Sequence, residues 1–214
     1  MPPVPTAHLA DLLPVASGIW RPQYQQETSI AGGELLAADL GPMLWVADVR
    51  TPRLELNRLR QLRARLLSVD GSLGAFYYTS PEALGPQADP RGTILGEAEV
   101  EIESIGADNR SIAFRGLPAG YVLTVGDMFH VDYGSPSRRA LFALTADGLA
   151  SGLGVTSEIG VRPHVRPGIL AGTAVTLIRP AAKVKIMPSS LTVDSDGPMS
   201  GVISFQIRQT LQAG

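Results

Sequence analysis

The sequence predicts a mainly-β protein with one prominent α-helix, built as a split β-sandwich with a small antiparallel β-barrel inserted between its halves. Three observations predict this fold class. Gly contributes 23 and Pro 17 of the 214 residues, which indicates many turns and short elements. Short alternating or apolar runs recur along the chain, as strands require. One segment alone has the three-and-four spacing of an amphipathic helix.

The helix is predicted over residues 52–69. Thr51 is a typical capping residue, and Pro52 suits the first turn because its missing N–H costs nothing there. Four leucines then recur on one face, and we expect them to anchor the helix against a sheet. These anchors are Leu56, Leu59, Leu62 and Leu66. Asp70-Gly71 is expected to end the helix.

Strands are predicted on both sides of this helix, over Met43–Val49 and Leu73–Tyr78. The polar stretch Gly85–Gly92 follows and is typical of a boundary between domains. Beyond it, glutamates alternate with apolar residues from Glu97 to Glu103, the period-two pattern of a strand with one wet face. Further short strands with turns between them suggest a barrel, and they are predicted at Ser111–Phe114, Tyr121–Val125, Met128–Tyr133 and Ala140–Leu144.

The carboxyl end adds strands at Ile159–Val165, Thr173–Ile178, Val184–Met187 and Gly201–Leu211. The last of these alternates cleanly, so it needs neighbouring strands, and the amino-terminal strand-helix-strand can supply them. We therefore predict that residues 1–86 and 173–214 form the sandwich and that residues 87–172 form an inserted, OB-like barrel.

Composition excludes several classes of function. The chain has no Cys, so it has neither disulfides nor thiolate chemistry. Its formal charge of −2 lacks the basic footprint of a nucleic-acid-binding protein. No apolar run is long enough to span a bilayer, and the amino end does not resemble a signal peptide. We expect a soluble protein made in a cytoplasm, with neither nucleic acid nor membrane as a partner.

Motifs for catalysis are scarce. Glycine-rich phosphate loops and the G-x-S-x-G elbow are absent from the sequence. Asp127, His130 and Asp132 can hold a metal or act as a general base if they converge, although Asp127 after Gly126 is also typical of a turn. The alternating glutamates suit a two-carboxylate glycosidase or, more simply, a solvated strand face. We predict no catalytic role and no cofactor.

Two surface features allow binding functions. The aromatic residues Tyr24, Trp45 and Phe76–Tyr78 can form a platform for sugars or belong to the core. Six arginines and one glutamate lie between Arg50 and Arg65, in a chain with 18 basic residues in all. This segment is a solvated helix face or a subunit interface, in which arginines meet carboxylates of a neighbouring copy. The interface candidates are Arg58, Arg63 and Arg65, opposite Glu97, Glu99 and Glu101.

The order of these segments resembles tail-tip proteins of long-tailed bacteriophages. The similar segments are MLWVADV, LELNRLRQLRARLLSVDG and GAFYYTSP, then GLPAGYVLTVGDMFHVDYG, RRALFALTADG and IGVRPHVRPGILAGTAVTLIRPAAKVKI. The resemblance spans about Ile30 to Leu211 and is greatest to the distal tail protein family. It implies a hexameric ring in the virion, between the tail tube and the baseplate, hub or fibres. It brings no catalytic residues.

Membership of that family implies a β-sandwich with one helix and a peripheral β-domain, in agreement with the split layout. Many members also carry a carboxy-terminal carbohydrate-like module, which we do not expect in this chain. Two other functions remain open from the sequence. One is a carbohydrate-binding β module on the barrel, and the other is a metal-dependent hydrolase that uses Asp127, His130 and Asp132.

Overall fold

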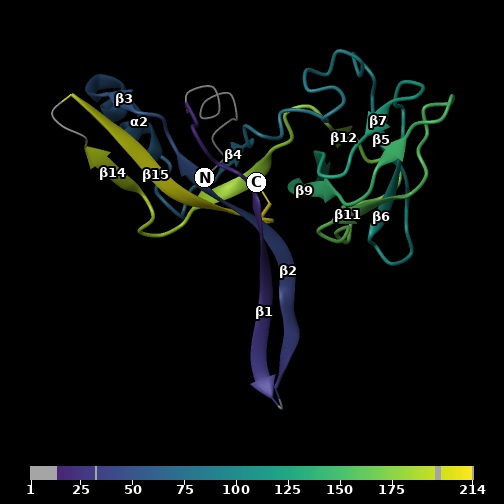
Figure 1. Ribbon diagram of the computed structural model, residues 1–214, viewed down its shortest axis with the longest axis horizontal. Coiled ribbons are helices and arrows are strands. Elements are labelled where there is room, and N and C mark those ends of the chain that lie inside the picture. The colour runs from purple at the N-terminus through teal and green to yellow at the C-terminus, as the bar shows by residue number, and fades with distance from the viewer. Residues whose placement is uncertain (1–13, 32, 196–198, 214) are drawn as a thin grey trace.

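The computed structural model describes residues 14–31, 33–195 and 199–213. The chain is mainly β, with 44% of it in strands and 6% in helix, and the predicted fold class is confirmed. Two β bodies lie side by side, and a long hairpin formed by the first two strands of the chain projects from one of them (Figure 1). Among the described residues, no helix has the length and apolar character needed to cross a membrane.

The first body is a seven-stranded sheet drawn from both ends of the chain. Its main path runs β1-β2-β15-β13-β4, while β3 and β14 also pair with β15. The strands are β1 (Arg21–Ala31), β2 (Glu34–Arg50), β3 (Leu54–Glu55), β4 (Phe76–Tyr78), β13 (Ala182–Ile186), β14 (Thr192–Ser195) and β15 (Ser200–Gln209). The terminal strand β15 has neighbours on both of its sides, as its alternating pattern predicts.

Helix α2 (Leu56–Leu67) packs on one face of this sheet through three of the four predicted anchors. Leu59, Leu62 and Leu66 are buried, and Leu56 packs against the same cluster while partly exposed. The predicted start at residue 52 is wrong. Thr51 does not cap the helix, because its hydroxyl accepts the backbone N–H of Ile203 and its own N–H donates to the Ile203 carbonyl. Pairing with β15 holds this segment extended until Glu55, the residue at the N-cap.

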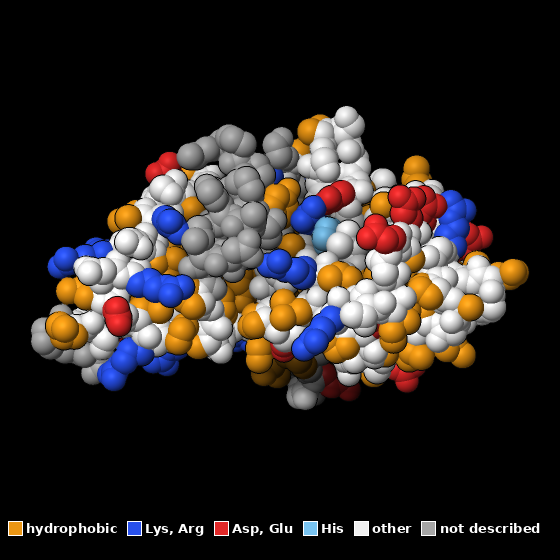
Figure 2. All heavy atoms as spheres, turned by 90° about the horizontal axis from the view of Figure 1, so that it is seen from above, with side chains coloured by type: hydrophobic (Ala, Val, Ile, Leu, Met, Phe, Trp, Pro, Cys, Tyr) orange, Lys and Arg blue, Asp and Glu red, His pale blue; other side chains and the backbone are white. Residues whose placement is uncertain are grey.

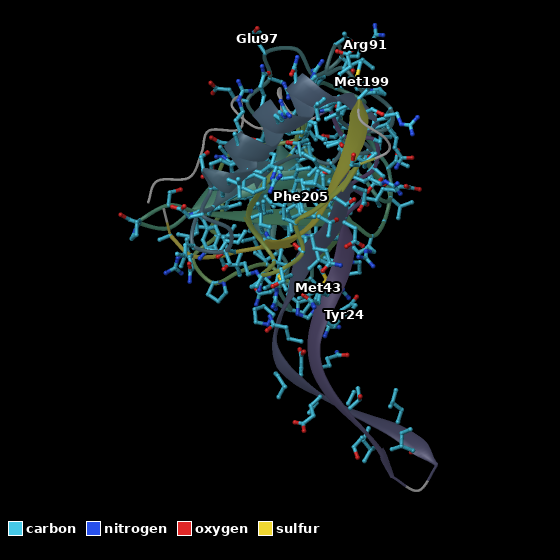
Figure 3. All side chains as sticks on the ribbon, turned by 90° about the vertical axis from the view of Figure 1, so that its left-hand side faces the viewer. Tyr24, Met43, Arg91, Glu97, Met199 and Phe205 are labelled. Carbon is cyan, nitrogen blue, oxygen red and sulfur yellow. The ribbon has the colours of Figure 1, made fainter. Side chains whose placement is uncertain are left out.

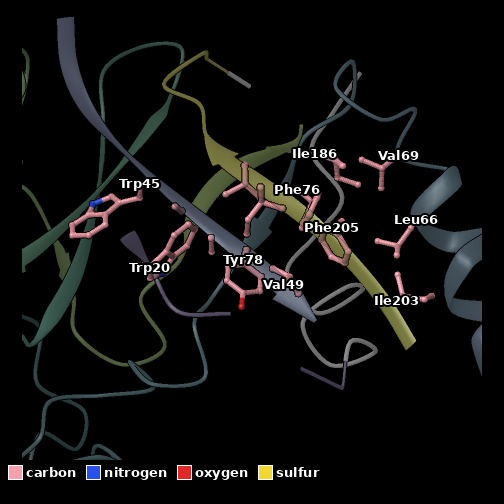
Figure 4. Packing of buried hydrophobic residues seen from close by; sticks show 14 of the residues in the cluster. Trp20, Trp45, Val49, Leu66, Val69, Phe76, Tyr78, Ile186, Ile203 and Phe205 are labelled. Atoms are coloured by element: carbon pink, nitrogen blue, oxygen red, sulfur yellow. The ribbon is translucent and has the colours of Figure 1, made fainter. Parts of the chain in front are cut away.

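The core of the first body lies between α2 and the sheet (Figure 4). Odd-numbered residues of β15, such as Ile203 and Phe205, point into it and meet Leu66 and Val69 from the helix side. Trp20 and Tyr78 form an edge-to-face pair with ring centroids 5.2 Å apart. The Tyr78 hydroxyl donates to the Gly18 carbonyl at 2.9 Å, which satisfies the one polar atom of that buried ring.

The second body is a six-stranded antiparallel sheet that nearly closes into a barrel. Its strand order is β12-β8-β9-β11-β6-β5. The strands are β5 (Glu101–Ile105), β6 (Ser111–Arg115), β8 (Met128–Tyr133), β9 (Arg138–Leu144), β11 (Ile159–Arg162) and β12 (Val175–Thr176), with β7 (Val122–Leu123) and β10 (Gly148–Leu149) as a separate pair. Backbone hydrogen bonds between Val175 and Val100 and between Ile102 and Thr173 join the two outer strands.

The barrel strands lie between β4 and β13 in the sequence, and two hydrophobic clusters follow the two bodies. Several contacts join the bodies. The Trp45 indole N–H donates to the Leu141 carbonyl at 2.9 Å, and an Arg166 guanidinium N–H donates to the Met43 carbonyl at 2.8 Å. The predicted limit 172/173 is too early, because Val175 of β12 pairs with Val131 of β8 and lies with Leu177 in the barrel core. The limit 86/87 stays a prediction, and residues 1–13 of the first segment lie outside the described residues.

Some predicted strands have different limits. The glutamate strand begins only at Glu101, although exposure already alternates before it, and the strand predicted from Leu73 begins at Phe76. The boundary stretch Gly85–Gly92 is tied into the structure by Asp89. This buried carboxylate accepts backbone N–H groups of Thr93, Ile94 and Leu95 at 2.8 to 3.0 Å.

Candidate subunit interface

The projecting hairpin, which we call the arm, consists of residues 25–31 of β1 and residues 33–41, most of which belong to β2. Its strands pair from Gln25 opposite Gly41 to Ala31 opposite Glu34, with a register shift between Gln25 and Gln26. Figure 3 shows it extending from the body, beyond Tyr24 and Met43, with no other element beside it. Four of its large apolar side chains are more than half exposed: Ile30 at 79%, Leu35 at 68%, Leu36 at 53% and Leu40 at 68%.

Both faces of the arm carry apolar side chains. Residues opposite each other in an antiparallel pair lie on the same face, so Ile30 and Leu35 share one face. Leu36 lies on the other face, opposite Ser29. Strands with one buried face alternate between apolar and polar residues, and the arm does not. Both faces of the arm therefore expose apolar side chains to water.

The charge of the arm is entirely acidic. Glu27, Glu34 and Asp39 are its ionisable residues, and no Lys or Arg occurs between Arg21 and Arg50. The described acidic side chains of the arm are exposed. This combination of exposed leucines and carboxylates favours a partner surface that is apolar and basic.

The arginines of α2 provide a basic surface. Arg58, Arg60, Arg63 and Arg65 are exposed, and within the described part of the chain none of them forms an ion pair. Figure 2 shows Lys and Arg side chains gathered over the end of the molecule that holds α2, whereas acidic side chains are concentrated over the barrel end. Exposure of Arg58, Arg63 and Arg65 suits a solvated helix face and a subunit interface alike, so their contact with another copy stays a prediction.

Of these arginines, Arg65 alone is favourably placed for the helix, because it lies in the last turn, where the helix dipole favours a cation. Arg58 lies in the first turn, where the helix dipole favours acidic residues and none is present. Arg60 and Arg63 are three residues apart on the helix surface, a spacing at which like charges repel. The helix is held by its leucines, so its arginines are available for contacts outside the chain.

The predicted acidic counterpart is partly engaged within the chain. Arg115 forms hydrogen-bonded ion pairs with Glu101, at 2.5 and 2.9 Å, and with Glu103 at 3.4 Å. These pairs raise the pKa of Arg115, mainly through its hydrogen bond to Glu101. Glu97 and Glu99 are exposed. Of the three predicted interface glutamates, Glu101 already has a cationic partner.

The structure places His130 near Asp132 but does not bring Asp127 to them. Both Asp127 oxygens accept backbone N–H groups, from Gln87 and Thr124, at 2.8 Å. Asp132 instead forms a bidentate pair with Arg139 at 2.6 and 2.7 Å. His130 is buried, and its Nδ1 accepts the Ala181 N–H at 3.2 Å. Across the described ranges, no group of three or more potential metal ligands occurs.

Burial determines the protonation of His130. Its pKa is lowered to about 4, first because burial disfavours the charged ring and second because the Arg139 guanidinium is near, with Asp132 opposing both. Arg139 also lies over the ring of Tyr77, 4.4 Å from its centre, and so connects the barrel to β4. His130 and Arg139 thus add to the contacts between the two bodies.

The aromatic residues proposed as a sugar platform are separated. Trp45, Phe76 and Tyr78 are buried in the first core, whereas Tyr24 is exposed at the base of the arm. A hollow of about 330 Å³ between the bodies is lined by residues that include Trp20, Trp45, Glu82 and Asp127. Both of these carboxylates already accept backbone N–H groups, since Glu82 accepts the N–H of Trp20 at 3.2 Å.

Comparison with known proteins returned no relatives: no protein-family model matches the chain, and no curated protein matches it significantly. The arm is not among the elements predicted from the sequence. The Gly-Gly pair at positions 32 and 33 is a typical hairpin signal between two extended runs, and Gly33 has a φ of +83°. The Gly-Gly pair could therefore have predicted a hairpin at this position.

Proposed function

We propose that this chain is a structural subunit that assembles with copies of itself into a closed ring, at the tip of a bacteriophage tail. The observation that carries the proposal is the arm. A two-stranded hairpin is marginally stable at best in water, and this one projects with leucines exposed on both faces. Contact with a further protein surface would cover these side chains and stabilise the extended pair.

Charge separation supports assembly with identical copies. The segment from Arg50 to Arg65 has six arginines and one glutamate, while residues 22–49 have four acidic residues and no basic ones. In a closed ring each subunit presents two different surfaces to its neighbours, so separated charges of opposite sign on one chain favour a head-to-tail contact.

The tail-tip location rests on the resemblance in order and composition between segments of this chain and those of distal tail proteins. In that role the ring has six copies and joins the tail tube to the baseplate, hub or fibres. The function is mechanical and requires no catalytic group, metal or cofactor in this chain.

The mass of the purified protein in solution tests the assembly. Six copies of a 22.6 kDa chain give a particle of about 136 kDa. We expect light scattering to detect this mass and electron microscopy to show a closed ring. A 22.6 kDa monomer at every concentration tested would contradict the proposal.

Immunogold labelling of phage particles that contain the chain tests its location. We expect label at one end of the tail. Label along the whole tail, or none on the particle, would contradict the tail-tip role even if the purified protein forms rings.

A further inference from the structure

The arm and helix α2 match each other in charge, in length and in the spacing of their charged side chains. We propose that the arm of one copy lies along the arginine surface of α2 in the neighbouring copy. This inference rests on the proposed function, and it names the two surfaces that meet when copies assemble.

The charges have matching spacings. Glu27 and Glu34 lie on one face of the arm, because Glu27 pairs with Ala38 and Glu34 with Ala31. These pairs are four register positions apart, or about 13 Å at ~3.3 Å per residue. Arg58 and Arg65 lie along one side of α2, seven residues or about 10 Å apart at 1.5 Å per residue. The long arginine side chains can make up the small difference.

Overall lengths also agree. The arm from Gln25 to Ala31 is about 20 Å long, since six steps of ~3.3 Å separate its ends. Helix α2 has 12 residues and is therefore about 18 Å long. One arm thus covers one helix from end to end.

Apolar contacts accompany the charges. Leu36 lies on the same face of the arm as Glu27 and Glu34. Leu67 at the last turn of α2 is 57% exposed, and Leu73 just beyond the helix is 83% exposed. Leu67 is nine residues from Arg58 and therefore lies on the opposite side of the helix, so Leu73 is the apolar residue available to Leu36 at the end of the Arg58–Arg65 side. Removing these apolar side chains from water would add to the electrostatic attraction.

The contact must form between copies. Figures 1 and 3 show the arm pointing away from the body that holds α2, so an arm does not reach the helix of its own chain. The barrel is a poorer acceptor for an acidic arm, because residues 87–172 contain ten acidic and seven basic residues. The arginine surface of a second copy is the surface with the required charge.

Site-specific cross-linking tests which surfaces meet. Because the chain contains no cysteine, each introduced cysteine is unique. Glu34→Cys protein is mixed with Arg58→Cys or with Arg65→Cys protein, since the arm can run in either direction along the helix, and a short bismaleimide is added. We expect a two-chain product that contains one copy of each variant. The matched control is Glu34→Cys with Arg91→Cys, an exposed arginine outside α2, for which we expect background yield only.

Charge reversal provides the second test. Glu27→Arg/Glu34→Arg and Arg58→Glu/Arg65→Glu are each expected to weaken assembly by about tenfold or more, and an equimolar mixture or the four-site variant is expected to restore it. Arg91→Glu is the control and is expected to change nothing. Assembly is measured by sedimentation, and circular dichroism checks that each variant is folded.

Three outcomes would overturn the inference. The first is equal cross-linking to Arg91→Cys, and the second is normal assembly of the Glu27→Arg/Glu34→Arg variant. The third is rescue of Arg58→Glu/Arg65→Glu by Glu97→Arg/Glu99→Arg, which would place the arginines against the barrel glutamates. In all three cases the wild type still assembles, whereas a monomeric wild type would overturn the proposed function as well.

Discussion

The barrel and the arm are both antiparallel β-structure, yet the barrel buries its apolar side chains and the arm exposes them. In the barrel, the Val100 carbonyl accepts the backbone N–H of Val175, and the Ile102 N–H donates to the Thr173 carbonyl. These hydrogen bonds join the two outer strands, and Phe129 in the interior is 0% exposed. In the arm, two strands pair with each other alone and expose Ile30 and Leu36 on opposite faces. Closure satisfies strand edges and creates an interior, whereas a lone hairpin can do neither. The barrel can be stable within one chain, whereas we propose that the arm is covered by a partner.

The largest expected effect is on the barrel core. Phe129 stacks with Phe142 and meets Phe114 edge-on, each pair with ring centroids 5.2 Å apart. Phe129→Ala is expected to lower the free energy of unfolding by about 3 to 5 kcal/mol, because it leaves a cavity in a closed interior. Urea denaturation measures the change. A loss below about 1 kcal/mol would contradict the description of the barrel as a tightly packed core.

A smaller loss is expected at the segment that leads into the barrel. Asp89→Ala removes the acceptor for the backbone N–H groups of Thr93, Ile94 and Leu95 and is expected to cost about 2 to 4 kcal/mol. Asp89→Asn keeps one acceptor oxygen and serves as the matched control, with a smaller expected loss. Urea denaturation of both variants tests the order, and equal stability of Asp89→Ala and wild type would show that these bonds contribute nothing.

The contact between the bodies is expected to weaken in acid. Because the pKa of His130 is about 4 in the folded chain, below its ordinary value of 6.5, the unfolded chain binds a proton first as the pH falls. Stability from the neutral ring is therefore complete above about pH 6.5 and is lost toward pH 4, by at most about 3 kcal/mol.

His130→Asn isolates this effect. Its side-chain oxygen can replace Nδ1 as the acceptor for the Ala181 N–H, and it does not titrate in this range. Thermal unfolding of both proteins between pH 7 and pH 4.5 is the measurement. We expect a smaller loss of stability for His130→Asn, and parallel curves for the two proteins would contradict the role of His130.

The smallest expected effect on folding is in the arm. Leu36→Ala is expected to change the free energy of unfolding of the monomer by less than about 0.5 kcal/mol, because Leu36 is already exposed. Its assembly is nevertheless expected to weaken, as sedimentation can measure. Leu153→Ala, at a barrel position that is 90% exposed, is the control and should leave both stability and assembly unchanged. If Leu36→Ala and Leu153→Ala assemble equally well, the exposed leucines of the arm have no special role in assembly.

Local patterns in the sequence predicted much of the fold. Three-and-four spacing located the leucines of α2, and strand propensity located β8 with its limits, Met128–Tyr133. The start of α2 was wrong because Thr51 pairs with Ile203, more than 150 residues away in the chain. Long-range pairing of this kind overrides a capping signal, which is local.

The candidate interface was predicted only in part. The arginines of α2 were recognised by their charge density, but the arm was not, because neither of its strands has the alternation that a buried face produces. Asp127, His130 and Asp132 illustrate the opposite case. Their spacing suggested a site, yet each side chain has a separate partner, which only the folded chain supplies.

By itself, the sequence determined the mainly-β class, the leucine face of α2, the basic segment from Arg50 to Arg65 and the lack of thiol chemistry. These depend on composition and on contacts between residues a few positions apart. The tertiary structure alone decided that the arm projects without cover, that Glu101 is paired with Arg115, and that His130 is buried. Solvent exposure and charge pairing depend on which distant segments meet, and local patterns do not contain that information.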